Sequence, residues 1–285
     1  MNKTYTEALA GASSLLEAAH IDPDAARYVL EYRAGFTPTQ LQLHGREPLP
    51  DALAEQFAKD VKRLLQNVPP QYIVGLAPFF GRDFKVTPAV LIPRFETEEL
   101  VAWAESDSAT STTLLDVGCG SGVIGLTLAR RLPQLAVTLV DISEAALAVA
   151  KANAEAQKLQ VEFHQSDLFA GLSGRRFERI VANLPYISHA EEAVMDRSTL
   201  DFEPRLALFA EHDGLALFER FCQALPQHVT AGACVYLEFG YHQQPALAAL
   251  FAEQLPQVQV EFRQDMAGHP RMVKLTFPTT ASSEA

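Results

Sequence analysis

The sequence predicts an α/β fold in which a mostly parallel β-sheet, with one antiparallel pair at its edge, follows a small helical domain. Three observations support this prediction. Residues 4–67 carry apolar side chains at helical spacing, whereas short apolar strands alternate with helical segments from Leu114 onward. The last two expected strands are separated only by a turn, which favours an antiparallel pair.

We expect three segments along the chain: a helical domain over residues 1–68, a connector over 69–105, and a larger α/β domain over 106–285. Pro69-Pro70 ends the first segment, because proline cannot continue a helix. The connector is expected to contain a hairpin-like stretch and a linking helix over 96–105. Helices of the first domain are expected to begin near Thr4, at Asp22-Pro23 and at Pro50-Asp51.

The α/β domain alternates apolar runs with amphipathic segments. Strands that are separated by crossover helices run parallel and are covered on both faces. The expected strands are 114–117, 136–140, 161–164, 179–182, 233–239, 258–263 and 272–277. One helix is expected to follow the first of these strands and to end near Arg131, and three more are expected over 143–157, 214–224 and 245–254.

Composition excludes several classes of protein. The 285 residues include 23 basic and 35 acidic side chains, and this acidic balance argues against direct nucleic-acid binding through phosphates. Three cysteines and eight histidines show neither disulfide nor metal-ligand spacing, so we expect no metal site. No apolar run approaches the roughly 18 residues of a membrane span, and the first residues lack a signal pattern. We therefore expect a cytoplasmic protein with no membrane partner.

A glycine-rich turn, Asp116–Gly122, lies between the first strand of the α/β domain and the following helix. Glycines there let the backbone turn sharply and approach a ligand closely. Asp141 ends the next strand, 21 residues after Gly120, where a carboxylate can accept hydrogen bonds from both hydroxyls of a ribose. The alternative is a tight turn with a helix-capping Asp. The predicted cofactor-binding residues here are Asp116, Gly118, Cys119, Gly120, Ser121, Gly122 and Asp141.

The nucleoside could belong to NAD or to S-adenosylmethionine, because Gly120–Gly125 also spells G-x-G-x-x-G. Two features favour S-adenosylmethionine. Asp116 can meet the amino group of a methionine moiety, a contact for which NAD has no use. Asp167 and Leu168 follow the third strand and can meet an adenine amino group and ring, although Asp167 could instead cap a helix.

The turn Asn183-Leu184-Pro185-Tyr186 follows the fourth strand, at the carboxyl edge where open α/β sheets bind ligands. The side-chain oxygen of Asn183 and the carbonyl of Leu184 can each accept one N–H of a planar NH₂ group. Pro185 stiffens the turn, and Tyr186 can cover the flat face of the substrate. We predict these four residues to be catalytic and substrate-binding, and Asn183 to contact the cofactor as well. The alternative is a plain Asn/Pro turn with a core tyrosine.

The glycine turn together with Asn-x-Pro-Tyr resembles the class I amino-methyltransferases, and further stretches resemble the release factor glutamine N5-methyltransferases (the PrmC/HemK family). This resemblance implies a Rossmann-like class I methyltransferase sheet, S-adenosylmethionine as cofactor, and N5 methylation of a glutamine in the GGQ motif of a peptide chain release factor. It also implies that the helical domain docks the release factor. The further stretches are 70–75, 90–98, 166–169, 202–204, 207–208, 213–215, 237–240 and 265–271.

The resemblance also places Arg94 and Glu96 in a linker at the substrate entrance, where the alternative is a solvated helix start. Two positions depart from the family pattern, since Leu184 and Phe95 each stand where proline is usual. Leu184 contributes a backbone carbonyl, so the change keeps the functional group.

Four other functions compete with this interpretation. A ribosomal protein L3 glutamine methyltransferase would share both domains. An adenine-N6 methyltransferase would use the same turn but favours a basic groove. A NAD-dependent oxidoreductase leaves the Asn-x-Pro-Tyr turn unexplained, and a silent binding module has no need of the cofactor and amide contacts.

Overall fold

The computed structural model describes residues 3–279 and divides into two compact units. We call them the helical unit and the sheet unit. Residues 69–105, expected as a separate connector, are shared between the two units. Within the described part, the helical unit comprises residues 3–76 and 195–202, and the sheet unit comprises residues 77–194 and 203–279.

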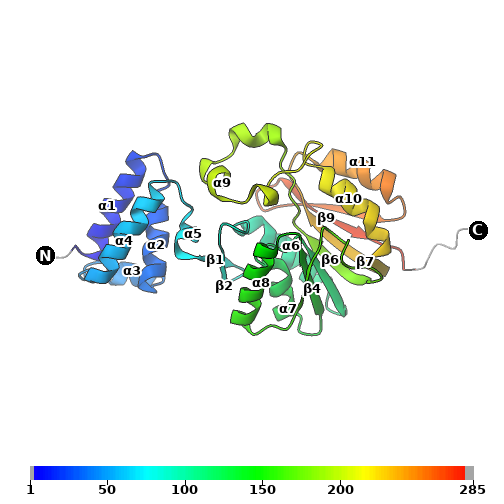
Figure 1. The fold of residues 1–285 in the computed structure, drawn as a ribbon, viewed down its shortest axis with the longest axis horizontal. Coiled ribbons are helices and arrows are strands. Elements are labelled where there is room, and N and C mark those ends of the chain that lie inside the picture. Colours follow the sequence, from blue (N-terminus) through cyan, green and yellow to red (C-terminus); the bar gives the residue numbers. More distant parts are fainter. Residues whose placement is uncertain (1–2, 280–285) are drawn as a thin grey trace, which may run out of the picture. The chain divides into compact units, whose positions relative to one another are not determined.

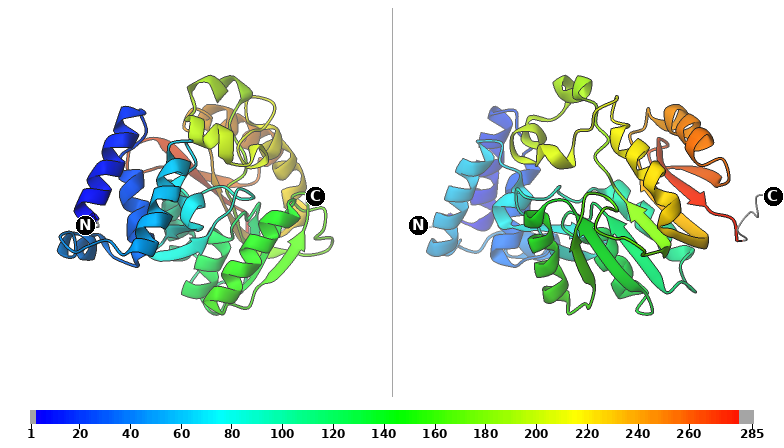
Figure 2. Two further views of the ribbon diagram at one scale, coloured as in Figure 1. Left: turned by 60° about the vertical axis from the view of Figure 1, so that its left-hand side comes forward. Right: turned by 45° about the vertical axis from the view of Figure 1, so that its right-hand side comes forward.

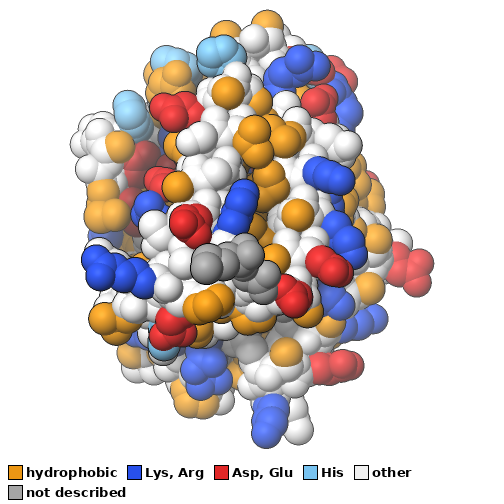
Figure 3. Space-filling model, turned by 90° about the vertical axis from the view of Figure 1, so that its left-hand side faces the viewer, with side chains coloured by type: hydrophobic (Ala, Val, Ile, Leu, Met, Phe, Trp, Pro, Cys, Tyr) orange, Lys and Arg blue, Asp and Glu red, His pale blue; other side chains and the backbone are white. Residues whose placement is uncertain are grey.

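The helical unit is built on the three helices that the sequence predicts, with a buried ion pair between two of them. The carboxylate of Asp60, 1% exposed, accepts hydrogen bonds from Arg33 Nε at 2.7 Å and Gln56 Nε2 at 2.9 Å. Three further helices have only five or six residues, which is too short for a visible apolar period. The helices are α1 (Tyr5–Ala18), α2 (Asp24–Ala34), α3 (Pro38–Leu43), α4 (Asp51–Leu64), α5 (Pro70–Val74) and α9 (Arg197–Phe202). Figure 3 faces this unit and shows side chains of both charge signs interspersed with apolar ones.

The sheet unit holds a seven-stranded sheet in the order β5-β4-β3-β6-β7-β9-β8 (Figure 1). The first five strands of this order pair in parallel, as predicted. The expected antiparallel edge pair is confirmed as β8–β9, and β9 also pairs antiparallel with β7, because it returns between the two. The strands are β3 (Thr113–Val117), β4 (Ala136–Asp141), β5 (Glu162–Gln165), β6 (Phe177–Ala182), β7 (Val229–Glu238), β8 (Gln259–Gln264) and β9 (Pro270–Thr276).

Helices cover both faces of this sheet (Figure 1, Figure 2). Successive residues of β3 and β6 alternate between two apolar clusters, so that Leu114 and Val181 point to one face while Leu115 and Ile180 point to the other. The cluster on the face of Leu114 includes residues of α6 (Phe95–Ser106), α7 (Val123–Arg131) and α8 (Glu144–Gln157). The cluster on the face of Leu115 includes residues of α10 (Ala216–Ala224) and α11 (Gln244–Gln254). Burial on both faces explains why the central strands are continuous apolar runs.

Three parts of the fold have weaker sequence signals. A two-stranded hairpin of β1 (Leu76–Phe79) and β2 (Arg82–Lys85) turns at Phe80 and Gly81, whose φ angles of 49° and 73° match a tight hairpin turn. Residues 189–207, which the sequence left without assigned structure, form short helices. These are η1 (His189–Val194), α9 (Arg197–Phe202) and η2 (Arg205–Ala207); η3 (Leu225–Gln227) follows α10.

Some kinds of feature are absent from residues 3–279. No helix in this range has both the length and the apolar composition needed to cross a bilayer. No group of three or more His, Cys, Asp or Glu side chains in the same range could hold a metal ion. The three cysteines are free thiols.

Candidate active site

A cavity in the sheet unit lies at the carboxyl ends of β3, β4 and β6, where the strand order changes direction. Open α/β sheets bind their ligands at this position. Eleven of the predicted site residues line it, from three loops, the last residue of β4 and the segment before α6: Arg94, Gly118, Cys119, Gly120, Ser121, Asp141, Asp167, Leu168, Asn183, Leu184 and Pro185. Asp116, Gly122, Glu96 and Tyr186 do not line it.

The glycine turn is held by hydrogen bonds with β4 and α8. The backbone N–H groups of Gly118 and Cys119 both donate to the carbonyl of Val140 at 2.9 Å. The buried Asn153 of α8 donates to the carbonyl of Ser121 at 2.9 Å. Gly118 has a φ of 70°, and a Cβ there would lie 3.3 Å from Leu184 Cδ2, so this position suits only glycine. The turn and the loop after β6 therefore pack directly on each other.

Asp141 supports the same turn with its carboxylate. Its Oδ2 accepts the N–H of Gly120 at 2.8 Å, and its Oδ1 accepts the N–H of Ser143 at 2.9 Å. Burial raises the pKa of this carboxyl, although the backbone donors oppose the rise. Each oxygen keeps a further lone pair, so the capping role and the predicted ribose contact can be fulfilled together.

Asp116 belongs to the glycine turn but does not line the cavity, and its predicted contact with a methionine amino group stays a prediction. Its side chain is fully buried, and its Oδ2 accepts the N–H of Gly125 at 2.8 Å. A Cβ at Gly125 would come within 2.9 Å of that oxygen, which explains the glycine at this position. Burial raises the pKa of Asp116 to about 7. The structure shows a carboxyl that ties β3 to the first turn of α7, behind the cavity wall.

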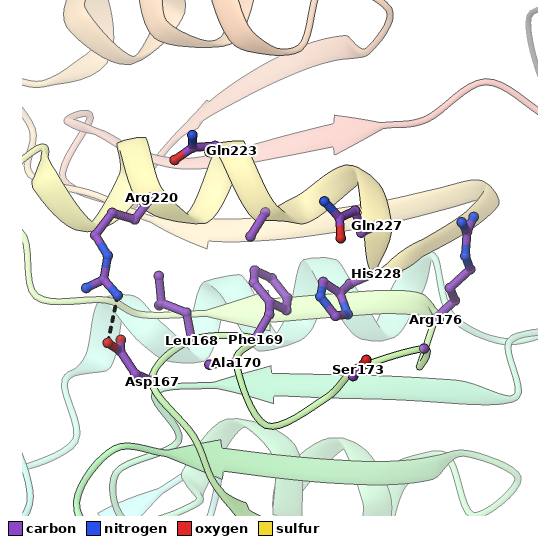
Figure 4. A pocket seen from close by; sticks show the side chains of 12 residues that line it. Asp167, Leu168, Phe169, Ala170, Ser173, Arg176, Arg220, Gln223, Gln227 and His228 are labelled. Atoms are coloured by element: carbon purple, nitrogen blue, oxygen red, sulfur yellow. Dashed lines mark hydrogen bonds and ion pairs between the residues drawn. The ribbon is translucent and has the colours of Figure 1, made fainter.

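Asp167 and Leu168 lie at the rim of the cavity, beside a second hollow (Figure 4). The Oδ2 of Asp167 accepts from Arg220 Nη2 at 2.7 Å, and the two side chains point toward one another in Figure 4. Asp167 is therefore paired with an arginine and does not cap a helix with its side chain. Because both partners are more than one-third exposed, solvent screens this ion pair.

The Asn183 turn has two oxygens that accept no hydrogen bond from the described residues. Asn183 Nδ2 donates to Thr97 Oγ1 at 3.2 Å, and that hydroxyl donates to Glu238 Oε2 at 2.7 Å. Among the hydrogen bonds of residues 3–279, none uses Asn183 Oδ1 or the carbonyl of Leu184. Asn183 and Leu184 both line the cavity.

Tyr186 lies behind this turn and is not a wall of the cavity. Its hydroxyl donates to Glu238 Oε1 at 3.2 Å, and its carbonyl accepts from Gln243 Nε2 at 2.9 Å. Burial raises the pKa of the Tyr186 hydroxyl. A Cβ at Gly214 would lie 2.0 Å from the Tyr186 carbonyl oxygen, so this glycine gives the tyrosine its room. The contact of Tyr186 with the flat face of a substrate stays a prediction.

A buried carboxylate connects the segment before α6 to the loop around η2. Glu203, 5% exposed, accepts from Arg94 Nη2 at 2.5 Å and from the N–H of Ile92 at 2.9 Å. The next residues, Pro204, Leu206 and Ala207, line the cavity. Arg94 thus fixes a wall through Glu203, whereas Glu96 does not line the cavity.

Sequence reasoning gave no role to Thr97, Glu203 or Glu238. Glu238 and Thr97 are 141 residues apart, and Glu203 and Arg94 are 109 apart. The only available signal was that these residues lie in the stretches 90–98, 202–204 and 237–240 that resemble a known family.

The sheet order, the glycine turn and the cavity define a class I methyltransferase fold. A family model described as "Methyltransferase small domain" matches residues 95–200, and one described as "PrmC N-terminal domain" matches residues 7–75. A methyltransferase structure from Pyrococcus furiosus has the same fold, with a TM-score of 0.55 and 14% identity over 78% of this chain and 99% of its own.

Relatives of similar length are closer in sequence and identify the family. The release factor glutamine methyltransferase of Enterococcus faecalis is 38% identical over 273 residues, which cover 95% of this chain and 99% of the relative. The protein of the same name from Streptococcus pneumoniae is 41% identical over 221 residues, covering 77% and 79%. The chain belongs to the release factor glutamine methyltransferase family.

Proposed function

We propose that this protein transfers the methyl group of S-adenosylmethionine to the side-chain amide nitrogen (N5) of a glutamine in the GGQ motif of a peptide chain release factor. The observation that supports this most strongly is the pair of unused acceptors, Asn183 Oδ1 and the Leu184 carbonyl, at the wall of a cavity beside the glycine turn. The names of the relatives point to the same substrate.

The cavity residues fit S-adenosylmethionine, which when bound supplies an electrophilic methyl group on a positively charged sulfur. Asp141 would hold the ribose hydroxyls, because both of its oxygens keep lone pairs. Asp167 and Leu168 would meet the adenine, and the turn over residues 118–122 would let the backbone approach the cofactor closely. The buried Asp116 would act through the turn.

The Asn183 turn addresses the main chemical difficulty, which is that an amide nitrogen is a poor nucleophile. Asn183 Oδ1 and the Leu184 carbonyl would each accept one N–H of the glutamine amide and so fix the direction of its nitrogen lone pair. As the nitrogen gains its bond to carbon it becomes positive, and its hydrogens become more acidic. Both acceptors then bind more strongly in the transition state than in the ground state, which is the condition for catalysis.

No carboxylate base is required in this proposal, since the cationic product amide loses its extra proton readily to water. Leu184 keeps the acceptor that a proline at this position would also offer, because the acceptor is a backbone carbonyl. Its buried side chain packs at Gly118, which restrains the turn in place of a second proline ring.

The helical unit is assigned the docking of the release factor, and the reaction is placed in the cytoplasm, where translation occurs. Neither a metal ion nor direct nucleic-acid binding is part of the proposal. The acidic balance of the chain, 23 basic against 35 acidic residues, supports a protein substrate over DNA.

A labelling experiment tests the proposal. The protein is incubated with methyl-labelled S-adenosylmethionine and, separately, with a release factor, ribosomal protein L3 and DNA. Label is expected in the release factor at the GGQ glutamine, and Asn183→Ala should remove most of it. Label in L3 or DNA without label in the release factor would contradict the proposal.

A further inference from the structure

The two acceptors of the proposed reaction differ in how their direction is fixed. The Leu184 carbonyl is part of the backbone and can only accept. The Asn183 carboxamide has an oxygen at one end and an NH₂ at the other, so rotation by half a turn about its last bond would replace an acceptor with a donor. A donor at that point would face the N–H of a substrate amide and repel it.

Two buried side chains determine which end of the carboxamide is turned to the cavity. Thr97 is 3% exposed and Glu238 is 1% exposed. The Thr97 hydroxyl has a single hydrogen, which it donates to Glu238 Oε2 at 2.7 Å. The lone pair of that hydroxyl is then left for Asn183 Nδ2, at 3.2 Å. The sequence of donors therefore runs in one direction, from amide to hydroxyl to carboxylate.

The carboxylate is held as an acceptor by groups from several elements. The Tyr186 hydroxyl donates to the second oxygen, Oε1, at 3.2 Å. Burial raises the pKa of Glu238, and the charge of Glu96 on α6 adds to the rise; the hydrogen bonds from Thr97 and Tyr186 and the positive charge of Arg271 on β9 oppose it. With a hydroxyl donor on each oxygen, the ionised carboxylate has accepting contacts at both ends, as a buried charge requires.

We propose that Thr97 and Glu238 are positioning residues that hold the Asn183 carboxamide with its oxygen presented to the substrate. This inference rests on the proposed function, in which that oxygen accepts an N–H of the glutamine amide. It assigns to the buried Glu238 a specific task in the reaction, exerted through Thr97, without contact with the substrate.

A matched pair of variants tests the hydroxyl. Thr97→Val keeps the shape of the side chain but removes the hydroxyl, and kcat is expected to fall about tenfold or more. The KM for the release factor and the Kd for S-adenosylhomocysteine should change by less than about twofold. Thr97→Ser restores the hydroxyl and is expected to recover most of the lost kcat. Thr127→Val, at a buried threonine of α7 outside the cavity wall, is the control for loss of a hydroxyl elsewhere.

A second variant tests the direction of the donors. In Glu238→Gln the new NH₂ group can donate to Thr97, which frees the threonine hydrogen to point at Asn183 and favours the reversed carboxamide. We expect kcat to fall at least as far as in Thr97→Val. Equal kcat for wild type, Thr97→Val and Glu238→Gln within about twofold would overturn the inference, as would failure of Thr97→Ser to recover activity.

A spectroscopic measurement is independent of turnover. The chain has four asparagines, Asn2, Asn67, Asn153 and Asn183, so a sample labelled with ¹⁵N at asparagine gives four side-chain amide signals. Asn183→Asp assigns the signal of interest. The hydrogens of the Asn183 side-chain NH₂ are expected to exchange with solvent slowly in wild type and Thr97→Ser, and rapidly in Thr97→Val. Equal exchange in wild type and Thr97→Val would refute the positioning role.

Failure of the proposed function can be distinguished from failure of the positioning role. If wild type does not methylate a release factor, the proposed function fails while the exchange measurement still reports on Asn183. If wild type methylates the release factor but Thr97→Val retains its kcat and its amide protection, only the positioning role fails.

Discussion

The two sides of the cavity use polar groups in opposite ways. On the side of the glycine turn, the carboxylates of Asp116 and Asp141 already accept backbone N–H groups, at 2.8 to 2.9 Å. On the side of the Asn183 turn, Asn183 Oδ1 and the Leu184 carbonyl accept nothing from residues 3–279. The first side uses its acceptors to hold its own backbone in shape, and the second leaves two acceptors unused by residues 3–279, as the proposed reaction requires.

This difference predicts that substitutions on the two sides separate turnover from cofactor affinity. Asn183→Ala should have the largest effect. Removing a preorganised group that meets developing charge lowers kcat by about 100-fold in comparable sites, and we expect a loss of at least about tenfold here. The Kd for S-adenosylhomocysteine, measured by calorimetry, should change by less than about threefold. Equal losses in kcat and in affinity would make Asn183 a structural residue.

Asp141→Ala should show the reverse pattern. The carboxylate supports the glycine turn and is proposed to bind the ribose, so we expect the Kd for S-adenosylhomocysteine to rise by about tenfold or more. Asp141→Asn, which keeps one oxygen acceptor, should lose less affinity. A Kd within about twofold of wild type for Asp141→Ala would remove this residue from the cofactor site.

A substitution at Asp116 can distinguish the buried structural role that the structure shows from the cofactor contact that the sequence predicts. Its pKa is about 7 in the folded protein, against about 4 when unfolded, so the folded state binds the extra proton. The stability that this proton provides is fully present below about pH 4 and is lost as the pH rises through 7.

Asp116→Asn does not titrate, so its stability relative to wild type should increase from pH 5 to pH 8. We expect the free energy of unfolding in urea at pH 8 to be about 1 kcal/mol higher than that of wild type. This increase is smaller than the Asp116 pKa shift alone would give, because the new NH₂ lacks a partner. The Kd for S-adenosylhomocysteine should stay within about threefold of wild type. A large loss of affinity would instead favour contact with the methionine amino group.

The ion pair at the rim should matter least. Arg220 and Asp167 are 53% and 43% exposed, so Arg220→Met should change the free energy of unfolding by no more than about 1 kcal/mol. Any change should shrink further in 0.5 M salt. A larger and salt-independent loss would show that Arg220 supports the loop by packing and not by charge.

The sequence predicted the parts of this molecule that depend on local pattern. The strands of the sheet, the glycine turn and the Asn-x-Pro-Tyr turn each show in a few consecutive residues. Their approach to one cavity followed from the rule that parallel strands place their carboxyl ends at one edge. The short helices α3 and α5 and the segment 189–207 could not be predicted in the same way, because their apolar residues show no sustained period.

Contacts across the chain were beyond local reasoning. Glu238 meets Thr97 from 141 residues away, and Glu203 meets Arg94 from 109 residues away, so neither carboxylate had a visible partner. The surroundings of Tyr186 and Asp116 were hidden for a related reason. A residue type shows which contact a side chain can make, but the close approach of Gly214 to the Tyr186 backbone and of Gly125 to the Asp116 carboxylate depends on the folded structure.

In the proposed reaction, Asn183 Oδ1 and the Leu184 carbonyl together receive the two hydrogens of a glutamine amide. A crystal structure with S-adenosylhomocysteine and a Gly-Gly-Gln peptide tests this most directly. We expect the glutamine nitrogen to lie about 3 Å from both oxygens. A glutamine whose carbonyl oxygen, instead of its nitrogen, faces Asn183 would contradict it.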